Sequence, residues 1–80
     1  RIKINPLTRS RKESFGGIAY VGNNIELLTQ AGFRVVQLMM QRGSFSSSEI
    51  AGELGLAESI IVDVASKLLG NKIVLKEERR

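Results

Sequence analysis

The chain has 80 residues, the size of one small domain, and a hydrophobic content of 42% that can fill a single core. It contains no cysteine and no histidine, which excludes a disulfide framework, thiol chemistry and the commonest general base. Much of the net charge of +4 lies near the start, where five cations precede the first acidic residue: Arg1, Lys3, Arg9, Arg11 and Lys12. Such a basic arm is typical of contact with nucleic acid, an anionic lipid surface or an acidic peptide, and also of a solvated end.

The composition disfavours catalysis. Asp63 is the only aspartate and the glutamates are scattered, so no carboxylate pair is placed for acid–base or metal chemistry. We therefore expect one non-catalytic domain over residues 1–80, without metal or cofactor. Apolar runs are too short for a membrane span, no secretory signal is recognised, and the lack of cysteine suits the cytoplasm.

Extended structure is predicted at the start of the chain. Residues 1–7 begin with alternating charged and apolar side chains and contain a proline at position 6. This pattern predicts an irregular or short edge segment that frays. Residues 8–14 are polar and are predicted to be extended. Gly16 and Gly17 mark either a bulge or a close approach of another backbone.

A β-hairpin is predicted next. Residues 18–21 are β-branched or aromatic and predict a strand. Residues 22–24 predict the turn, because glycine and asparagine tolerate positive φ, and residues 25–28 predict the return strand. Residues 8–14 can add a third strand before the hairpin.

Two helices are predicted after the hairpin. Thr29 is placed to cap the first, and Gly43 is placed to end it. Ser46 and Glu49 have the spacing of a capping box for the second, which stops at Gly55.

A third helix is predicted over residues 57–69, and it carries more than one apolar stripe. The stripe expected in the core consists of Ile61, Val64, Ala65 and Leu68, whereas Val62, Ser66 and Leu69 lie on a neighbouring face. The second stripe is either covered by the strands or forms a groove wall for a partner.

The end of the chain is predicted to be a short tail. Residues 73–75 indicate a terminal strand or a core-covering segment, and residues 76–80 are expected to fray.

The last two helices have the layout of a helix-turn-helix, so a winged-helix DNA-binding transcription regulator is the alternative function. The third predicted helix would be the recognition helix of such a regulator. It would present Glu58 and Asp63 to the DNA phosphates, where DNA-binding proteins place basic and amide side chains. The sequence therefore disfavours nucleic acid as a partner.

The strand at residues 25–28 is an edge if residues 8–14, 18–21 and 25–28 pair in that order. Its unpaired N–H and C=O groups are guarded only by Glu26. An unguarded edge beside an apolar helix face is what the addition of a peptide strand requires. The alternatives are pairing with the chain's own ends, or with a second copy in a homodimer.

Several stretches together resemble the PqqD-like family: Asn5-Pro6, residues 11–20, Leu28-Thr29 and residues 48–55. Members of this family are RiPP recognition elements, which bind the leader of a ribosomally made precursor peptide and present it to a modifying enzyme. The Phe-Gly-Gly segment at residues 15–17 is similar to the version that accompanies radical SAM maturases.

The resemblance implies an α+β, winged-helix-like fold, with a three-stranded antiparallel sheet followed by three helices. It also implies that the leader peptide adds as a further antiparallel strand, over a cleft between the third strand and the third helix. The implied peptide-binding residues are Asn24, Ile25, Glu26, Leu27 and Leu28 on the strand, and Val62, Ser66, Lys67 and Leu69 on the helix. Lys67 would pair with an acidic leader residue, and the implied partners are a precursor peptide and a radical SAM maturase.

Overall fold

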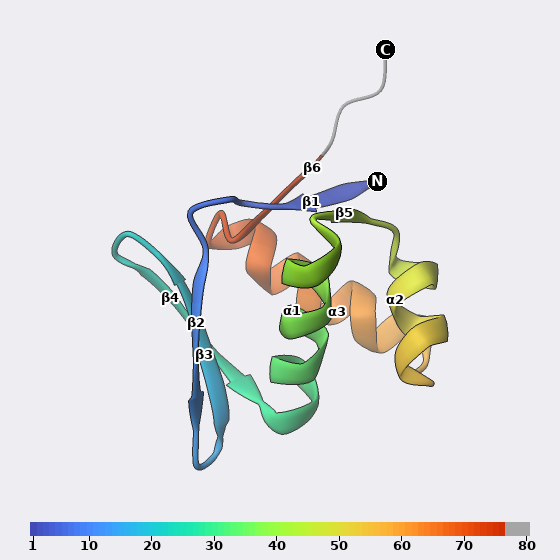
Figure 1. The fold of residues 1–80 in the computed structure, drawn as a ribbon, viewed down its shortest axis with the longest axis horizontal. Helices are drawn as coiled ribbons and strands as arrows, with labels where there is room; N and C mark the ends of the chain where they lie inside the picture. The colour runs from blue at the N-terminus through green and yellow to red at the C-terminus, as the bar shows by residue number, and fades with distance from the viewer. Residues whose placement is uncertain (77–80) are drawn as a thin grey trace.

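The computed structural model describes residues 1–76, which form an α+β fold of two small antiparallel sheets and three helices (Figure 1). In chain order the elements are β1 (Ile2–Ile4), β2 (Arg9–Glu13), β3 (Gly16–Val21), β4 (Asn24–Thr29), α1 (Gln30–Arg42), β5 (Ser44–Phe45), α2 (Ser47–Leu54), α3 (Glu58–Gly70) and β6 (Val74–Lys76). The prediction of a terminal strand near residues 73–75 is confirmed by β6. The fraying expected at residues 76–80 falls, beyond Lys76, outside the described residues.

The first sheet is the predicted three-stranded meander, with the order β2-β3-β4. Its register runs without a break along the hairpin, from Gly16 opposite Thr29 to Val21 opposite Asn24. The β3–β4 turn is therefore only two residues long, and Asn24, predicted in the turn, is already part of β4. Gly22 has a φ of 57°, which suits the first central position of a type II′ hairpin turn.

Gly16 and Gly17 mark a close approach and not a bulge. A Cβ on Gly17 would lie 2.1 Å from Cδ1 of Phe33, and one on Gly16 would lie 2.3 Å from the carbonyl oxygen of Leu28. The absence of both side chains lets α1 and the end of β4 lie directly against β3.

The second sheet, with the order β5-β1-β6, is absent from the prediction. The sequence predicts an irregular, frayed start at residues 1–7, whereas Ile2–Ile4 is the middle strand of this sheet. The reason is tertiary, because Ser44–Phe45 and Val74–Lys76 come from distant parts of the chain and pair with it on either side. The predicted fold, one three-stranded sheet followed by three helices, is thus only partly correct.

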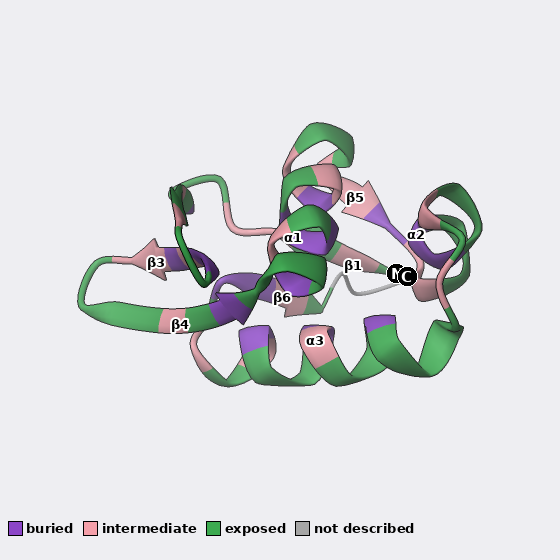
Figure 2. Cartoon of the chain, turned by 90° about the horizontal axis from the view of Figure 1, so that it is seen from below, coloured by how far each residue is buried: buried purple, intermediate pink, exposed green. Residues whose placement is uncertain are grey.

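The core lies between α1, α3 and the sheets, and Figure 2 shows the buried positions of α1 and α3 on the sides that face each other. Val35, Val36 and Met39 of α1 are fully buried, as are Ile61 and Leu68 of α3. The core stripe predicted for the third helix is therefore confirmed at Ile61, Ala65 and Leu68, whereas Val64 is only partly buried.

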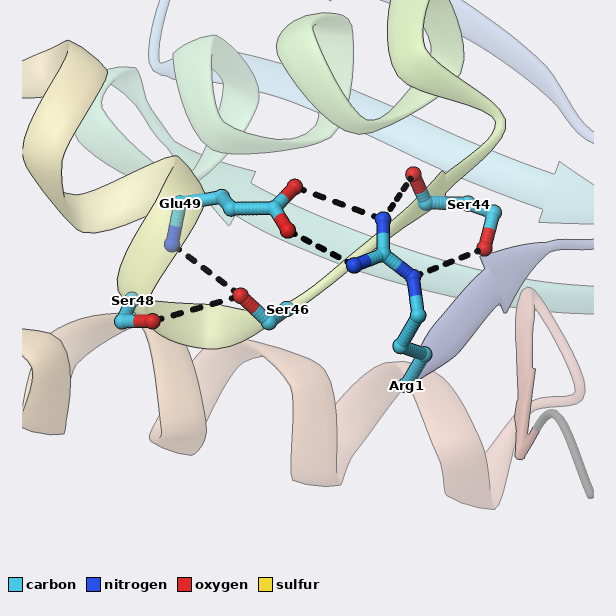
Figure 3. A network of polar contacts seen from close by, with 5 residues as sticks. All are labelled: Arg1, Ser44, Ser46, Ser48 and Glu49. Carbon is cyan, nitrogen blue, oxygen red and sulfur yellow. Dashed lines mark hydrogen bonds and ion pairs between the residues drawn. The ribbon is translucent and has the colours of Figure 1, made fainter. Parts of the chain in front are cut away.

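The capping box of α2 is combined with an ion pair to the first residue (Figure 3). The Ser46 hydroxyl accepts a hydrogen bond from the Glu49 backbone N–H at 3.2 Å, as the spacing predicts. The Glu49 carboxylate lies 2.7 Å from the Arg1 guanidinium, which also donates to the Ser44 carbonyl oxygen at 3.1 Å. The pKa of Glu49 lies below its ordinary value, chiefly because of the hydrogen bond from Arg1.

This lowered pKa predicts a pH dependence of stability. A carboxyl group with a depressed pKa in the folded state stabilises the fold above its unfolded pKa, and the effect is lost as the pH falls through the folded value. We expect the free energy of unfolding to fall more steeply below the ordinary value of 4.5 in the wild type than in Glu49→Gln or Arg1→Gln. Urea unfolding across a pH series measures this, and equal slopes in all three proteins would contradict it.

The C-terminal end of α3 is a Schellman motif. The Ile73 N–H donates to the Leu68 carbonyl at 2.9 Å, and the Lys72 N–H donates to the Leu69 carbonyl at 3.1 Å. Lys72 has a φ of 61°, in the left-handed region that such a motif normally fills with glycine.

Lys72→Gly should therefore raise the free energy of unfolding by about 0.5–1 kcal/mol, because it removes the steric cost of a Cβ at positive φ. Lys72→Ala is the matched control, since it removes the charge and keeps the Cβ. Denaturant unfolding compares the three proteins, and a glycine variant no more stable than the alanine variant would contradict the assignment.

Candidate functional site

The outer edge of β4 is open. Within residues 1–76, β4 pairs with β3 and with no other strand, which is the arrangement predicted for residues 25–28. Residues that flank a two-residue turn form a hydrogen-bonded pair, and the ladder alternates from there. Ile25 and Leu27 consequently direct their backbone N–H and C=O groups to the free side.

The side chains of β4 divide between the two faces of the sheet. Leu28 is only 6% exposed and faces the core, and the partly buried Glu26 shares its face. Ile25 and Leu27, which are 57% and 69% exposed, lie on the opposite face. This fixes the orientation of the strand, which the sequence leaves open.

A small groove lies between the inner face of β4 and α3. Its volume is about 70 Å³, which is space for one short side chain. Its lining comes from β4, the first turn of α1 and the second half of α3: Glu26, Leu27, Leu28, Thr29, Gly32, Val64 and Lys67. An apolar centre is thus bordered by one cation and one carboxylate.

The Glu26 carboxylate is held by a hydrogen bond between β4 and the end of α3. The Asn71 side-chain amide donates to Glu26 Oε1 at 2.7 Å, which ties the middle of β4 to the residue after α3. Glu26, the predicted guard of the edge, therefore has a partner on the inner side of the sheet. The exposed ammonium group of Lys67 is left as the cation of the groove.

The α3 wall differs from the predicted wall. Lys67 lines the groove as predicted, and Val64 lines it although the sequence pattern predicts Val64 in the core stripe. The other predicted helix residues do not line the groove: Val62, Ser66 and Leu69. At 100° per residue they lie on the other side of the buried stripe from Val64 and Lys67.

This difference has a physical reason. The apolar period of a helix shows which stripe is buried, but both flanks of that stripe look alike in the sequence. Which flank meets the hairpin depends on how α3 lies relative to β4, and a single helix pattern does not contain that information. Val62 is 47% exposed, so the second apolar stripe is only partly covered by the fold.

A larger hollow of about 660 Å³ lies at the other end of the sheet, between the β2–β3 turn and α1. Its lining mixes charged and amide side chains, including Lys12, Arg34 and Gln37, with apolar ones, including Phe33 and Leu38. Lys12 belongs to the predicted basic arm, but a pocket here was not predicted, because no local pattern brings β2 and α1 together.

Other kinds of site are not seen in residues 1–76. No three His, Cys, Asp or Glu side chains in this range gather as a metal site requires. No helix there has the length and apolarity needed to cross a membrane. Glu58 and Asp63 are exposed on the first half of α3, where a DNA reader would approach phosphates.

No family model matches the chain, and no match to it is found among curated proteins or solved structures. The resemblance to the PqqD-like family therefore stays a prediction that rests on the residues quoted for it.

The open edge makes a prediction for the isolated domain. The amides of Ile25 and Leu27 should exchange with solvent faster than those of Glu26 and Leu28, which the ladder directs toward β3. Residue-resolved hydrogen exchange by NMR measures this. Equal protection of the four amides would mean that the edge is covered in solution.

Proposed function

We propose that this domain is a non-catalytic chaperone for a ribosomally synthesised precursor peptide. It binds the leader of the precursor as an added strand on β4 and presents it to a modifying enzyme of the radical SAM type. The observation that carries the proposal is the open edge of β4 beside the groove that Leu28, Val64 and Lys67 line. Strand addition needs both features, because the edge supplies main-chain hydrogen bonds and the groove selects side chains.

Each part of the site has a role in this proposal. The backbone groups of Ile25 and Leu27 bond to the leader without regard to its sequence. A short aliphatic side chain enters the groove against Leu28 and Val64, and an acidic residue beside it pairs with Lys67. We expect micromolar affinity or better, which corresponds to about −8 kcal/mol or a more negative binding free energy.

The type of enzyme and the compartment follow from other features. The Phe-Gly-Gly segment at residues 15–17 supports a radical SAM maturase as the partner, through the resemblance alone. A precursor made by the ribosome is met in the cytoplasm, where a chain without cysteine is at no disadvantage. The domain itself would need no cofactor, and its winged-helix-like body would serve as a rigid holder.

A winged-helix DNA-binding regulator is the second candidate. The cations of β2, Arg9, Arg11 and Lys12, favour it because they can supply sequence-independent phosphate contacts. The exposed acids of α3, Glu58 and Asp63, oppose it. Gel shifts at two salt concentrations separate the candidates, because phosphate contacts give a steep salt dependence.

Calorimetric titration tests the main proposal, with synthetic leader peptides of any short precursors encoded near the gene for this domain. We expect Lys67→Glu to weaken binding at least tenfold, about 1.4 kcal/mol, because it reverses the charge that meets the acidic leader residue. Val62→Glu is the matched control, since it adds the same charge on the other flank of α3 and should leave the affinity unchanged.

Both side chains are exposed, so both variants should fold, and circular dichroism verifies this. Absence of binding by every leader, or equal losses in the two variants, would refute the proposed site.

A further inference from the structure

We propose that a peptide bound to β4 is read on both faces of the sheet. In addition to the side chain in the groove, it carries apolar side chains at the two alternate positions opposite Ile25 and Leu27. This inference rests on the proposed function, and it names the class of peptide that the edge takes.

The register of the sheet provides the first argument. On the outer face, Tyr20 lies opposite Ile25, and Ile18 lies opposite Leu27. Side chains in such cross-strand positions touch, with Cβ atoms about 4.5–5.5 Å apart. The outer face therefore carries two apolar rows that run across the strands and end at the free edge of β4.

Exposure provides the second argument. Ile18 and Tyr20 on β3 are partly buried, whereas Ile25 and Leu27 at the ends of the rows are 57% and 69% exposed. An added strand would place its outward side chains directly beside Ile25 and Leu27, in the position that β4 occupies relative to β3. The rows are thus completed by the ligand itself.

Charge does not compete with this apolar pairing. Arg9 and Arg11 belong to the same rows, opposite Tyr20 and Ile18, but they lie on β2. An added strand would be three strand spacings from β2, roughly 14 Å. The outer face accordingly offers the ligand apolar neighbours, while the cation that selects acidic residues is Lys67 on the inner face.

The alternation of an extended peptide converts these contacts into a sequence pattern. Positions opposite Ile25 and Leu27 are two residues apart and point outward, and the residue between them points to the inner face. The expected ligand therefore has aliphatic or aromatic residues at two alternate positions that point to the outer face. The residue that enters the groove and the acidic residue occupy the intervening positions, which point to the inner face.

Selection from a displayed library of random dodecapeptides tests this pattern. Four baits are used: the wild type, Leu27→Arg, Ile25→Arg and the control Val62→Arg. The wild-type and control pools should share apolar residues at two alternate positions. Leu27→Arg should replace one of them by Asp or Glu, and Ile25→Arg should move that acidic preference by two positions.

A selected peptide then gives a quantitative check. Glu in place of its outward residue opposite Leu27 should weaken binding to the wild type about fivefold, near the upper end of cross-strand pair energies. The same substitution should restore binding to Leu27→Arg. The three side chains that the variants replace by arginine, Ile25, Leu27 and Val62, are exposed in the wild type, so the variants should remain folded.

The other outcomes are decisive in different ways. Identical pools from all four baits would overturn two-faced reading and leave strand addition intact. Failure to enrich any peptide on any bait would overturn the proposed function together with this inference. Sedimentation measures the oligomeric state. A wild-type dimer that Leu27→Arg dissociates would also overturn this inference, because the edge would then pair with a second copy.

Discussion

Backbone N–H and C=O groups at the edge of a sheet must form hydrogen bonds with a partner or with water, and β4 has such an edge. Within residues 1–76 the free side of β4 meets no other strand, so water satisfies those groups. The strand is nevertheless held firmly on its other sides. Leu28 is buried in the core, β3 pairs along the whole length of β4, and Asn71 bonds to Glu26. An edge that is rigid and unpaired loses little conformational entropy when another strand binds.

The two faces of β4 differ in what they add to that edge. Main-chain bonds alone select no sequence, so discrimination must come from side chains. The inner face offers a confined groove with Lys67 at its border, and the outer face offers open apolar rows that end at Ile25 and Leu27. The confined groove distinguishes ligand side chains by size and charge, whereas the open apolar rows favour any side chain that buries apolar area against them. Together they would select a pattern and not a single residue.

Local chemistry allowed much of this fold to be predicted. Thr29 accepts a hydrogen bond from the Gly32 N–H at 3.0 Å, Gly43 ends α1, and the β2-β3-β4 meander has the expected order. Each of these depends on neighbours in the sequence. The second sheet depends on contacts between segments far apart in the chain, which no local pattern contains.

The same limit explains what was missed in the site. The edge strand could be predicted because a hairpin brings its own partner, and Lys67 lines the groove beside it, as predicted. Val64 was predicted in the core and Val62 in the groove wall, because the choice between the flanks of α3 depends on how the helix lies relative to β4. The contact of Asn71 with Glu26, 45 residues apart, is of the same non-local kind.

The direction of β4 adds a geometric consequence to strand addition. β4 runs from Asn24, next to the turn, to Thr29, where α1 begins. An antiparallel strand on its free side therefore enters near Thr29 and leaves near the β3–β4 turn. A leader precedes the segment that is modified, so that segment would emerge at the Gly22–Asn23 end, away from α1 and α2. Figure 1 shows this turn projecting beyond the helices, so an enzyme could receive the emerging segment there without displacing the leader from the groove.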